Sequence, residues 1–297
     1  DVWSRHKDFH FIPHERSFMK KINNAQEVRE FYNKTTDQFI EVYGDIIQAF
    51  RTKNVQDYLA YTLNSARISE GEKILDAGCG ICGPAIYIAD NIKDIHINAL
   101  TISDIQVEKG KVLIHESGNE NKITLHHGDY HLMHEYFDKS SFDLVYFLES
   151  FGHSSNQNGL IDAAWDVLKP GGRIYIKDLF KRFVEDEWEQ LRIDQICDQI
   201  NQAYEYHICN LTQIIHKLRQ KGFIVQFIQI PDINMSDFEK LTISNKFQDM
   251  FHIAKIDSWD NYIFPIDFYE ILAFKPKNNV LLEKHLYHLT SDLNNED

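Results

Sequence analysis

A glycine-rich loop is the first feature of the sequence whose residue types and spacing are suited to chemistry. The string Asp-Ala-Gly-Cys-Gly-Ile-Cys-Gly at 76–83 contains the pattern G-x-G-x-x-G, after a short apolar run and before a helix pattern. Glycines at these positions let the backbone turn tightly and approach a nucleotide-like ligand closely. Because the pattern is short, it is not specific by itself, and its flanks must indicate which ligand it holds.

The residues around the loop disfavour a dinucleotide. Asp76 ends the first predicted strand just ahead of the first glycine. A site for NAD would place an Asp or Glu at the end of the second strand, where it holds the ribose. That strand ends in Ala99, Leu100 and Thr101 instead. A nicotinamide-dependent oxidoreductase is therefore a weaker hypothesis, which a cofactor-binding assay would decide.

Cysteine and histidine are common metal ligands, but their spacing in this sequence does not support a metal site. Cys79 and Cys82 form a C-x-x-C inside the glycine loop, where small residues are needed, and eleven residues separate Cys197 from Cys209. Four histidines gather near the third predicted strand: His126, His127, His131 and His134. Because neighbouring strand residues face opposite ways, these four side chains do not converge. We expect no metal site.

Strand and helix patterns alternate around these motifs. Short apolar runs predict strands at 73–78, 95–100, 123–128, 142–148 and 173–179, with two closing strands at 222–230 and 268–276. Helix patterns follow the first and second of these strands, and another precedes the fifth. This alternation predicts an α/β fold with a Rossmann-like, seven-stranded, mostly parallel sheet. Helical periodicity also predicts N-terminal helices and a helical cap inserted after the fifth strand.

The composition is that of an ordinary globular protein and weighs against several functions. The 297 residues are 43% hydrophobic and 26% charged, and no apolar run approaches the ~18–20 residues that span a bilayer. The formal net charge is −14, without a basic stripe that would neutralise phosphates, so we expect no nucleic-acid partner. Few cysteines and a charged N-terminal stretch predict a cytoplasmic location.

The combination of motifs resembles class I S-adenosylmethionine-dependent methyltransferases over about residues 30 to 275. ILDAGCG at 74–80 and LKPGG at 168–172 carry this resemblance. FYNKTTDQF at 31–39, TISDIQ at 101–106 and FLESFGH at 147–153 are similar to elements of one branch. That branch includes cyclopropane-fatty-acid synthases, sterol and tocopherol C-methyltransferases and geranyl diphosphate C-methyltransferase. EVYGDIIQAFR at 41–51 lacks the Gly-x-x-Phe-His stretch typical of sterol enzymes, which leaves the acceptor open.

The resemblance implies S-adenosylmethionine as the cofactor. Asp76 would hold the methionyl ammonium, Asp129 would accept from the adenine amino group, and Tyr32 would close the methionine end. Thr101 and Gln106 would bond the ribose hydroxyls, although helix capping is a structural alternative. The full expected set is Tyr32, Asp76, Gly78, Gly80, Gly83, Thr101, Ile102, Gln106, Asp129, Tyr130 and Leu148. Mg²⁺ would enter only with a diphosphate substrate.

Glu149 and His153 are the expected catalytic residues. Glu149 follows a buried strand at the carboxyl edge of the sheet, where open α/β folds bind ligands. Methylation of an alkene leaves a carbocation, which a carboxylate and neighbouring aromatics such as Phe147 and Phe151 can stabilise. A base must then remove a proton, and His153 could assist. The plainer alternative is that both residues only stabilise the loop.

The leading hypothesis is therefore C-methylation of a small apolar prenyl or alkene acceptor. O- or N-methylation of a specialised metabolite stays open, as does a non-catalytic scaffold that keeps the cofactor. We expect an N-terminal helical arm and lid (1–70), a cofactor-binding core (71–180), a helical cap (181–221) and C-terminal strands that complete the sheet (222–297). Apolar residues of the arm hint at a homo-oligomer: Val2, Trp3, Phe9, Phe11 and Ile12.

Overall fold

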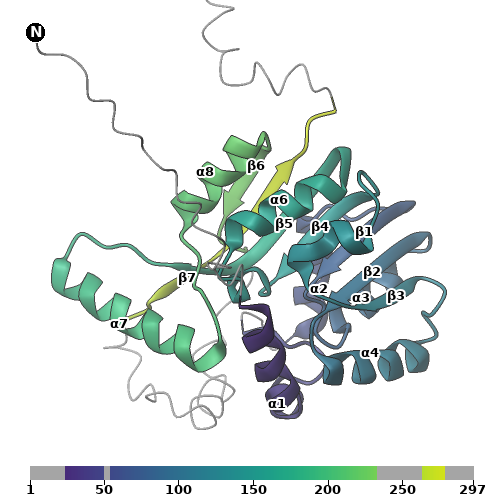
Figure 1. Ribbon diagram of the computed structural model, residues 1–297, viewed down its shortest axis with the longest axis horizontal. Helices are drawn as coiled ribbons and strands as arrows, with labels where there is room; N and C mark the ends of the chain where they lie inside the picture. Colours follow the sequence, from purple (N-terminus) through teal and green to yellow (C-terminus); the bar gives the residue numbers. More distant parts are fainter. Residues whose placement is uncertain (1–23, 50–53, 233–262, 278–297) are drawn as a thin grey trace, which may run out of the picture.

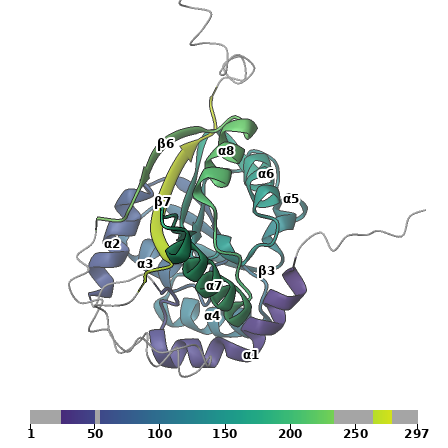
Figure 2. The ribbon, with the colours of Figure 1, turned by 90° about the vertical axis from the view of Figure 1, so that its left-hand side faces the viewer.

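The computed structural model describes residues 24–49, 54–232 and 263–277 (Figure 1). Residues 1–23 lie outside the described residues, and they contain the apolar side chains on which the expected self-association depends. Within the described part, a twisted sheet is covered by helices on both faces (Figure 2). None of the helices in this part combines the length and apolar character needed to cross a bilayer.

The sheet confirms the predicted architecture. Its strands in the described residues follow the order β3-β2-β1-β4-β5-β7-β6. Their bounds are β1 Glu72–Ala77, β2 Ile95–Thr101, β3 Ile123–His127, β4 Phe142–Leu148, β5 Leu168–Lys181, β6 Ile224–Gln229 and β7 Ile266–Phe274. Only β7 runs antiparallel to its neighbours β5 and β6. The strand order reverses between β1 and β4, which is where open α/β sheets bind ligands.

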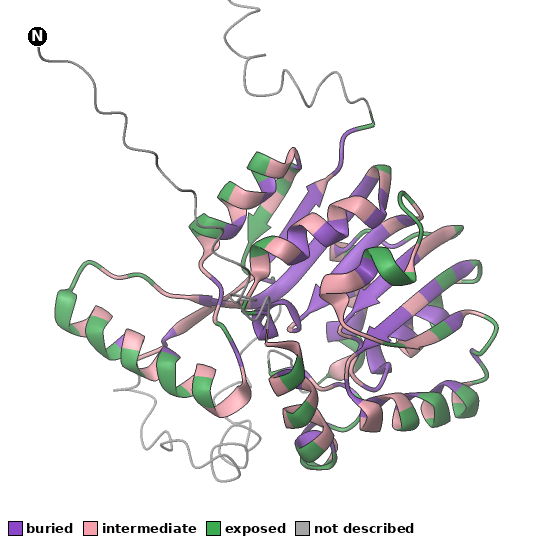
Figure 3. Cartoon of the chain, in the orientation of Figure 1, coloured by how far each residue is buried: buried purple, intermediate pink, exposed green. Residues whose placement is uncertain are grey.

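Two sets of helices cover the sheet. The first comprises α5 (Met133–Tyr136), α6 (Gln157–Val167) and α8 (Leu211–Lys221). The second comprises α2 (Val55–Ser65), α3 (Gly83–Asn91) and α4 (Asp104–Ser117). The central strands are buried along nearly their whole length (Figure 3), which explains their continuous apolar sequence.

Helix α1 (Ala25–Tyr43) packs against α4 through polar contacts. Arg29 donates two hydrogen bonds of 2.9 Å to Asp104, and Asn33 donates to the same carboxylate at 2.8 Å. Asn33 also accepts from Ser103, the residue that caps α4. These contacts hold α1 at the carboxyl ends of the strands.

The expected cap at 181–221 contains two helices with different surroundings. α7 (Glu187–Tyr204) projects away from the sheet in Figure 1, with Trp188 78% exposed and only Ile193 and Cys197 buried. α8 instead lies beside α6, where Lys217 pairs with Asp162 at 2.8 Å. The inserted element is therefore α7, whereas α8 is one of the helices that cover the sheet. The four-part division of the chain stays a prediction.

Candidate functional site

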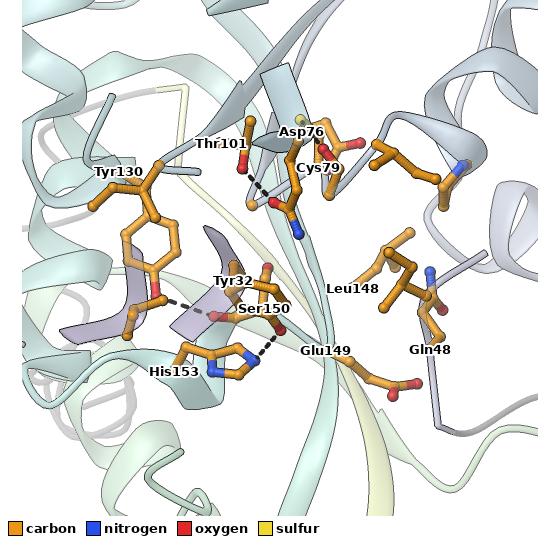
Figure 4. A pocket seen from close by; sticks show the side chains of 18 of the residues that line it. Tyr32, Gln48, Asp76, Cys79, Thr101, Tyr130, Leu148, Glu149, Ser150 and His153 are labelled. Atoms are coloured by element: carbon orange, nitrogen blue, oxygen red, sulfur yellow. Dashed lines mark hydrogen bonds between the residues drawn. The ribbon is translucent and has the colours of Figure 1, made fainter. Parts of the chain in front are cut away.

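A pocket lies at the carboxyl ends of β1, β2 and β4, beneath α1 (Figure 4). Most of the expected cofactor residues line it: Tyr32, Asp76, Gly78, Gly80, Thr101, Ile102, Gln106, Asp129, Tyr130 and Leu148. The expected catalytic residues Glu149 and His153 line it as well. The fold therefore brings together side chains that are more than one hundred positions apart in the sequence.

The glycines of the loop serve different purposes. Gly78 has φ +92°, and a Cβ there would lie 2.5 Å from Cβ of Ser150, so only glycine fits under the pocket. Gly83 does not line the pocket. A Cβ at Gly83 would lie 2.1 Å from the carbonyl oxygen of Asp45. The absence of a side chain at Gly83 therefore leaves room for the segment after α1 to pack there. Gly83 thus acts through packing, without contacting the pocket.

Asp76 has a buried carboxyl group in which one oxygen atom lacks a hydrogen-bond donor. The residue is 2% exposed, and its Oδ2 has no hydrogen-bond partner among the described residues. Burial raises the pKa of this carboxyl group to about 7. Buried polar atoms are nearly always bonded, so this atom is suited to a cationic ligand group. The methionyl ammonium of S-adenosylmethionine fits that requirement.

Thr101 and Gln106 lie together, as the ribose hypothesis requires. Thr101 Oγ1 donates to Gln106 Oε1 at 2.6 Å, and both residues are buried. The N-cap of α4 is Ser103, so Thr101 does not cap the helix. Because the Gln106 carbonyl oxygen accepts from Thr101, its amide group is oriented as a donor toward the pocket that it lines.

His131 was missed as a pocket residue in the sequence, where its only signal was its place beside Asp129. Asp129 Oδ1 accepts from the backbone nitrogen of His131 at 2.9 Å and pairs with its Nδ1 at 2.6 Å. The other ring nitrogen meets Ser154 Oγ at 2.7 Å. The imidazole therefore fixes the orientation of Asp129.

The remaining histidines near β3 have separate partners. His126 contacts Asn98 at 2.9 Å, and His127 contacts the carbonyl of Ile102 at 3.0 Å. Among the described residues, no three His, Cys, Asp or Glu side chains form a group that could hold a metal. Cys79 and Cys82 are free thiols within the glycine loop, with their sulfur atoms 3.7 Å apart.

His153 is held from two sides. Its Nδ1 lies 3.0 Å from the carbonyl of Glu205, which only an N–H can satisfy, so Nε2 accepts from the hydroxyl of Tyr32 at 2.7 Å. Burial lowers the pKa of His153 to about 4, which keeps the ring neutral. His153 thus connects α1 to the end of α7. Its expected role as an assisting base stays a prediction.

Glu149 lines the same pocket in a strained backbone conformation. Its φ is +54°, which is rare for a residue with a side chain. Oε1 accepts from Lys177 Nζ at 2.8 Å, and Oε2 accepts from the backbone nitrogen of Ala49 at 2.6 Å. Burial alone would lower the pKa of Lys177, but the attraction of Glu149 outweighs it and raises that pKa.

Two aromatic residues expected beside Glu149 lie elsewhere. Phe147 and Phe151 are fully buried, pack edge to face at 5.1 Å and belong to the core beneath α6. The strand β4 ends at Leu148, and the left-handed backbone of Glu149, with φ +54°, turns its side chain away from the face that Phe147 occupies in the strand. Aromatic rings that do line the pocket come from Tyr32 and Tyr130.

Comparisons with known proteins relate this chain to methyltransferases. Residues 74–172 match the family model described as a methyltransferase domain. The sterol 24-C-methyltransferase of Gibberella zeae is 28% identical over 221 residues, covering 71% of this chain and 56% of the relative. That of Candida albicans is 30% identical over 224 residues, covering 70% and 57%. The chain thus spans little more than half the length of these curated relatives.

Solved structures share the fold. The [4+2]-cyclase SpnF superposes with a TM-score of 0.68 at 20% identity, covering 86% of this chain and 97% of the cyclase. Geranyl diphosphate C-methyltransferase from Streptomyces coelicolor A3(2) has a TM-score of 0.63 at 14% identity, covering 84% and 97%. Residues 74–172 thus match a methyltransferase domain, and the solved structures show that the chain shares its fold with proteins such as geranyl diphosphate methyltransferase, whose complex with SAM has a TM-score of 0.59.

Proposed function

We propose that this chain is a class I methyltransferase that transfers the methyl group of S-adenosylmethionine to a carbon of an apolar prenyl or alkene acceptor. The observation that carries the proposal is the position of Glu149. Its carboxylate lies in the same pocket as the cofactor residues, at the end of β4, with its side chain 6% exposed. The sterol 24-C-methyltransferase relatives and the geranyl diphosphate C-methyltransferase structure support carbon as the nucleophile.

The residues of the cofactor end bind and orient. When bound, S-adenosylmethionine supplies an electrophilic methyl group on a sulfonium sulfur. Asp76 neutralises the methionyl ammonium, Gln106 donates to the ribose, and Asp129 accepts from the adenine amino group. Methyl transfer is an in-line displacement, so much of the rate enhancement comes from alignment and from exclusion of water. α1 and the segment 44–49 cover the pocket and contribute to that exclusion.

The residues of the acceptor end stabilise charge. As the new carbon–carbon bond forms and the carbon–sulfur bond breaks, the positive charge moves onto the acceptor. Glu149 stabilises the resulting carbocation through the Coulomb attraction of its carboxylate, and the faces of Tyr32 and Tyr130 add cation–π attraction. A proton on the adjacent carbon then leaves to a base, and the carboxylate of Glu149 takes that role in this proposal.

An acceptor panel tests the proposal. The purified protein is incubated with S-adenosylmethionine and prenyl diphosphates, sterols, phenols and amines, with and without Mg²⁺, and products are identified by mass spectrometry. We expect one added methylene unit on a prenyl or sterol carbon. Methylation confined to oxygen or nitrogen would overturn the carbocation mechanism and leave the cofactor site intact.

Glu149→Gln sharpens the test once an acceptor is found. The variant keeps the shape and removes the charge, so we expect a loss of turnover of roughly 10²-fold or more, typical for an electrostatic stabiliser. Binding of S-adenosylmethionine should change little. The exposed Glu70→Gln is the matched control, because it makes the same chemical change away from the pocket.

A further inference from the structure

We propose that Lys177 is a positioning residue that keeps Glu149 ionised and correctly oriented at the acceptor end. The proposal deepens the methyl transfer proposed above and rests on it for the role of Glu149. Lys177 was not singled out in the sequence, where it interrupts the apolar run of β5. Nothing in the pattern of that strand indicates a partner one strand away.

The geometry places Lys177 behind Glu149. Its side chain is fully buried, and Nζ lies 2.8 Å from Glu149 Oε1. The ammonium also lies 4.8 Å from the ring centroid of Tyr58. The Tyr58 hydroxyl donates to Gln48, which lines the same pocket as Glu149. Lys177 thus holds the carboxylate from the protein interior without lining the pocket itself.

The stability of the fold does not by itself explain why a buried Lys177–Glu149 ion pair is present. Taking two charges out of water costs about as much as their attraction returns, and apolar residues of similar volume often fold as well or better. Glu149 further bears backbone strain, since its φ is +54°. A strained, buried ion pair whose carboxylate faces a ligand pocket is typical of a residue held for function.

Other charged and titratable groups around Glu149 work in the opposite direction. Among the described residues, groups electrostatically coupled to Glu149 lie on β5, α1, α2 and the loop after α7: Asp178, Tyr32, Tyr58 and Tyr206. Asp45, from the segment after α1, lines the same pocket. All of these side chains are acidic, whereas Lys177 is a cation that pairs with the carboxylate. Without Lys177, the ionised form of Glu149 would lose this Coulomb attraction.

The pH dependence of thermal stability tests the Lys177–Glu149 ion pair and requires no acceptor substrate. Thermal unfolding is measured between pH 5.5 and 8.5 for the wild type, Lys177→Met, Glu149→Gln and the double variant. In Lys177→Met the folded state binds a proton that the unfolded state has released, so its stability falls as pH rises. We expect the melting-temperature loss to be larger at pH 8.5 than at pH 5.5, and the double variant to abolish that pH dependence.

The rate profile tests the positioning role. With the acceptor found by the panel, we expect kcat/KM of Lys177→Met to fall at least tenfold further at pH 6 than at pH 8.5, with Lys177→Arg restoring the wild-type profile. A loss that is equal at both pH values would overturn the proposal. The two proposals can fail separately. If the acceptor panel yields only O- or N-methylation and the four proteins still show the expected pH dependence of stability, the carbocation function is wrong and the ion-pair assignment stands.

Discussion

The two ends of the pocket are assembled in different ways. Most residues of the proposed cofactor end come from β1, β2, β3 and the turns that follow them, between residues 76 and 131. The proposed acceptor end joins the segment after α1 to β4 and β5, through contacts such as Ala49 to Glu149 that span one hundred residues. The first end is a local product of strand–turn–helix units, and the second exists only once the whole sheet is formed.

Replacing Asp76 should have the largest effect on the cofactor end. Asp76→Asn removes the charge that faces the methionyl ammonium, and we expect the affinity for S-adenosylmethionine to fall roughly 100-fold, which is about 2.8 kcal/mol. Because an unpaired buried carboxylate is costly, the ligand-free variant should also melt at a higher temperature at pH 8. Calorimetric titration and thermal unfolding measure the two effects.

The control for this variant is Asp138→Asn, which makes the same change at an exposed position. Unchanged affinity in Asp76→Asn would remove this carboxylate from the site. It would also remove the proposed contrast between the Asp76 end, which binds the methionyl ammonium, and the Glu149 end, which stabilises a carbocation.

The pKa of Asp76 predicts how binding depends on pH. With that pKa raised to about 7 by burial, the ligand-free carboxyl group is mostly protonated at pH 6. Binding an ammonium must then displace the proton, so we expect affinity to be about tenfold lower at pH 6 than at pH 8. The stability that Asp76 contributes is fully present below its unfolded pKa of about 3.9 and is lost as pH rises through about 7.

Titrations across this pH range check the prediction, and Asp76→Asn should abolish the dependence. A slope that survives in the variant would assign the titration to another group. In that case the cofactor end would depend on more distant residues, and the contrast with the acceptor end would weaken.

His131 should have a moderate effect on recognition of the adenine ring. His131→Phe removes the hydrogen bonds that orient Asp129, and we expect roughly tenfold weaker binding of S-adenosylhomocysteine. S-inosylhomocysteine lacks the amino group, so the preference for the adenine compound should shrink in the variant. His134→Phe, at an exposed position, is the matched control. An equal loss for both compounds would give His131 a purely structural role.

Sequence reasoning succeeded where contacts are local. The strands, the helix starts near Gly83 and Asp104, and the residues of the glycine loop follow from short patterns whose meaning depends on nearby residues. Lys177 shows the limit, because its partner is on another strand and no spacing rule links 149 to 177. Gly83 shows a second limit. The sequence assigns it to the ligand, whereas its neighbour is the backbone of Asp45, which only the folded chain brings there.

Tyr32 offers the smallest expected effect and links the two ends. Tyr32→Phe leaves Nε2 of the buried His153 without its donor, which should lower the free energy of unfolding by about 1 kcal/mol and weaken cofactor binding a few-fold. Tyr87→Phe controls for loss of a hydroxyl. Chemical denaturation and titration measure both quantities. If the variant loses stability without losing affinity, the Tyr32–His153 contact belongs to the long-range framework of the acceptor end; if it loses both in parallel, closure of α1 couples the two ends.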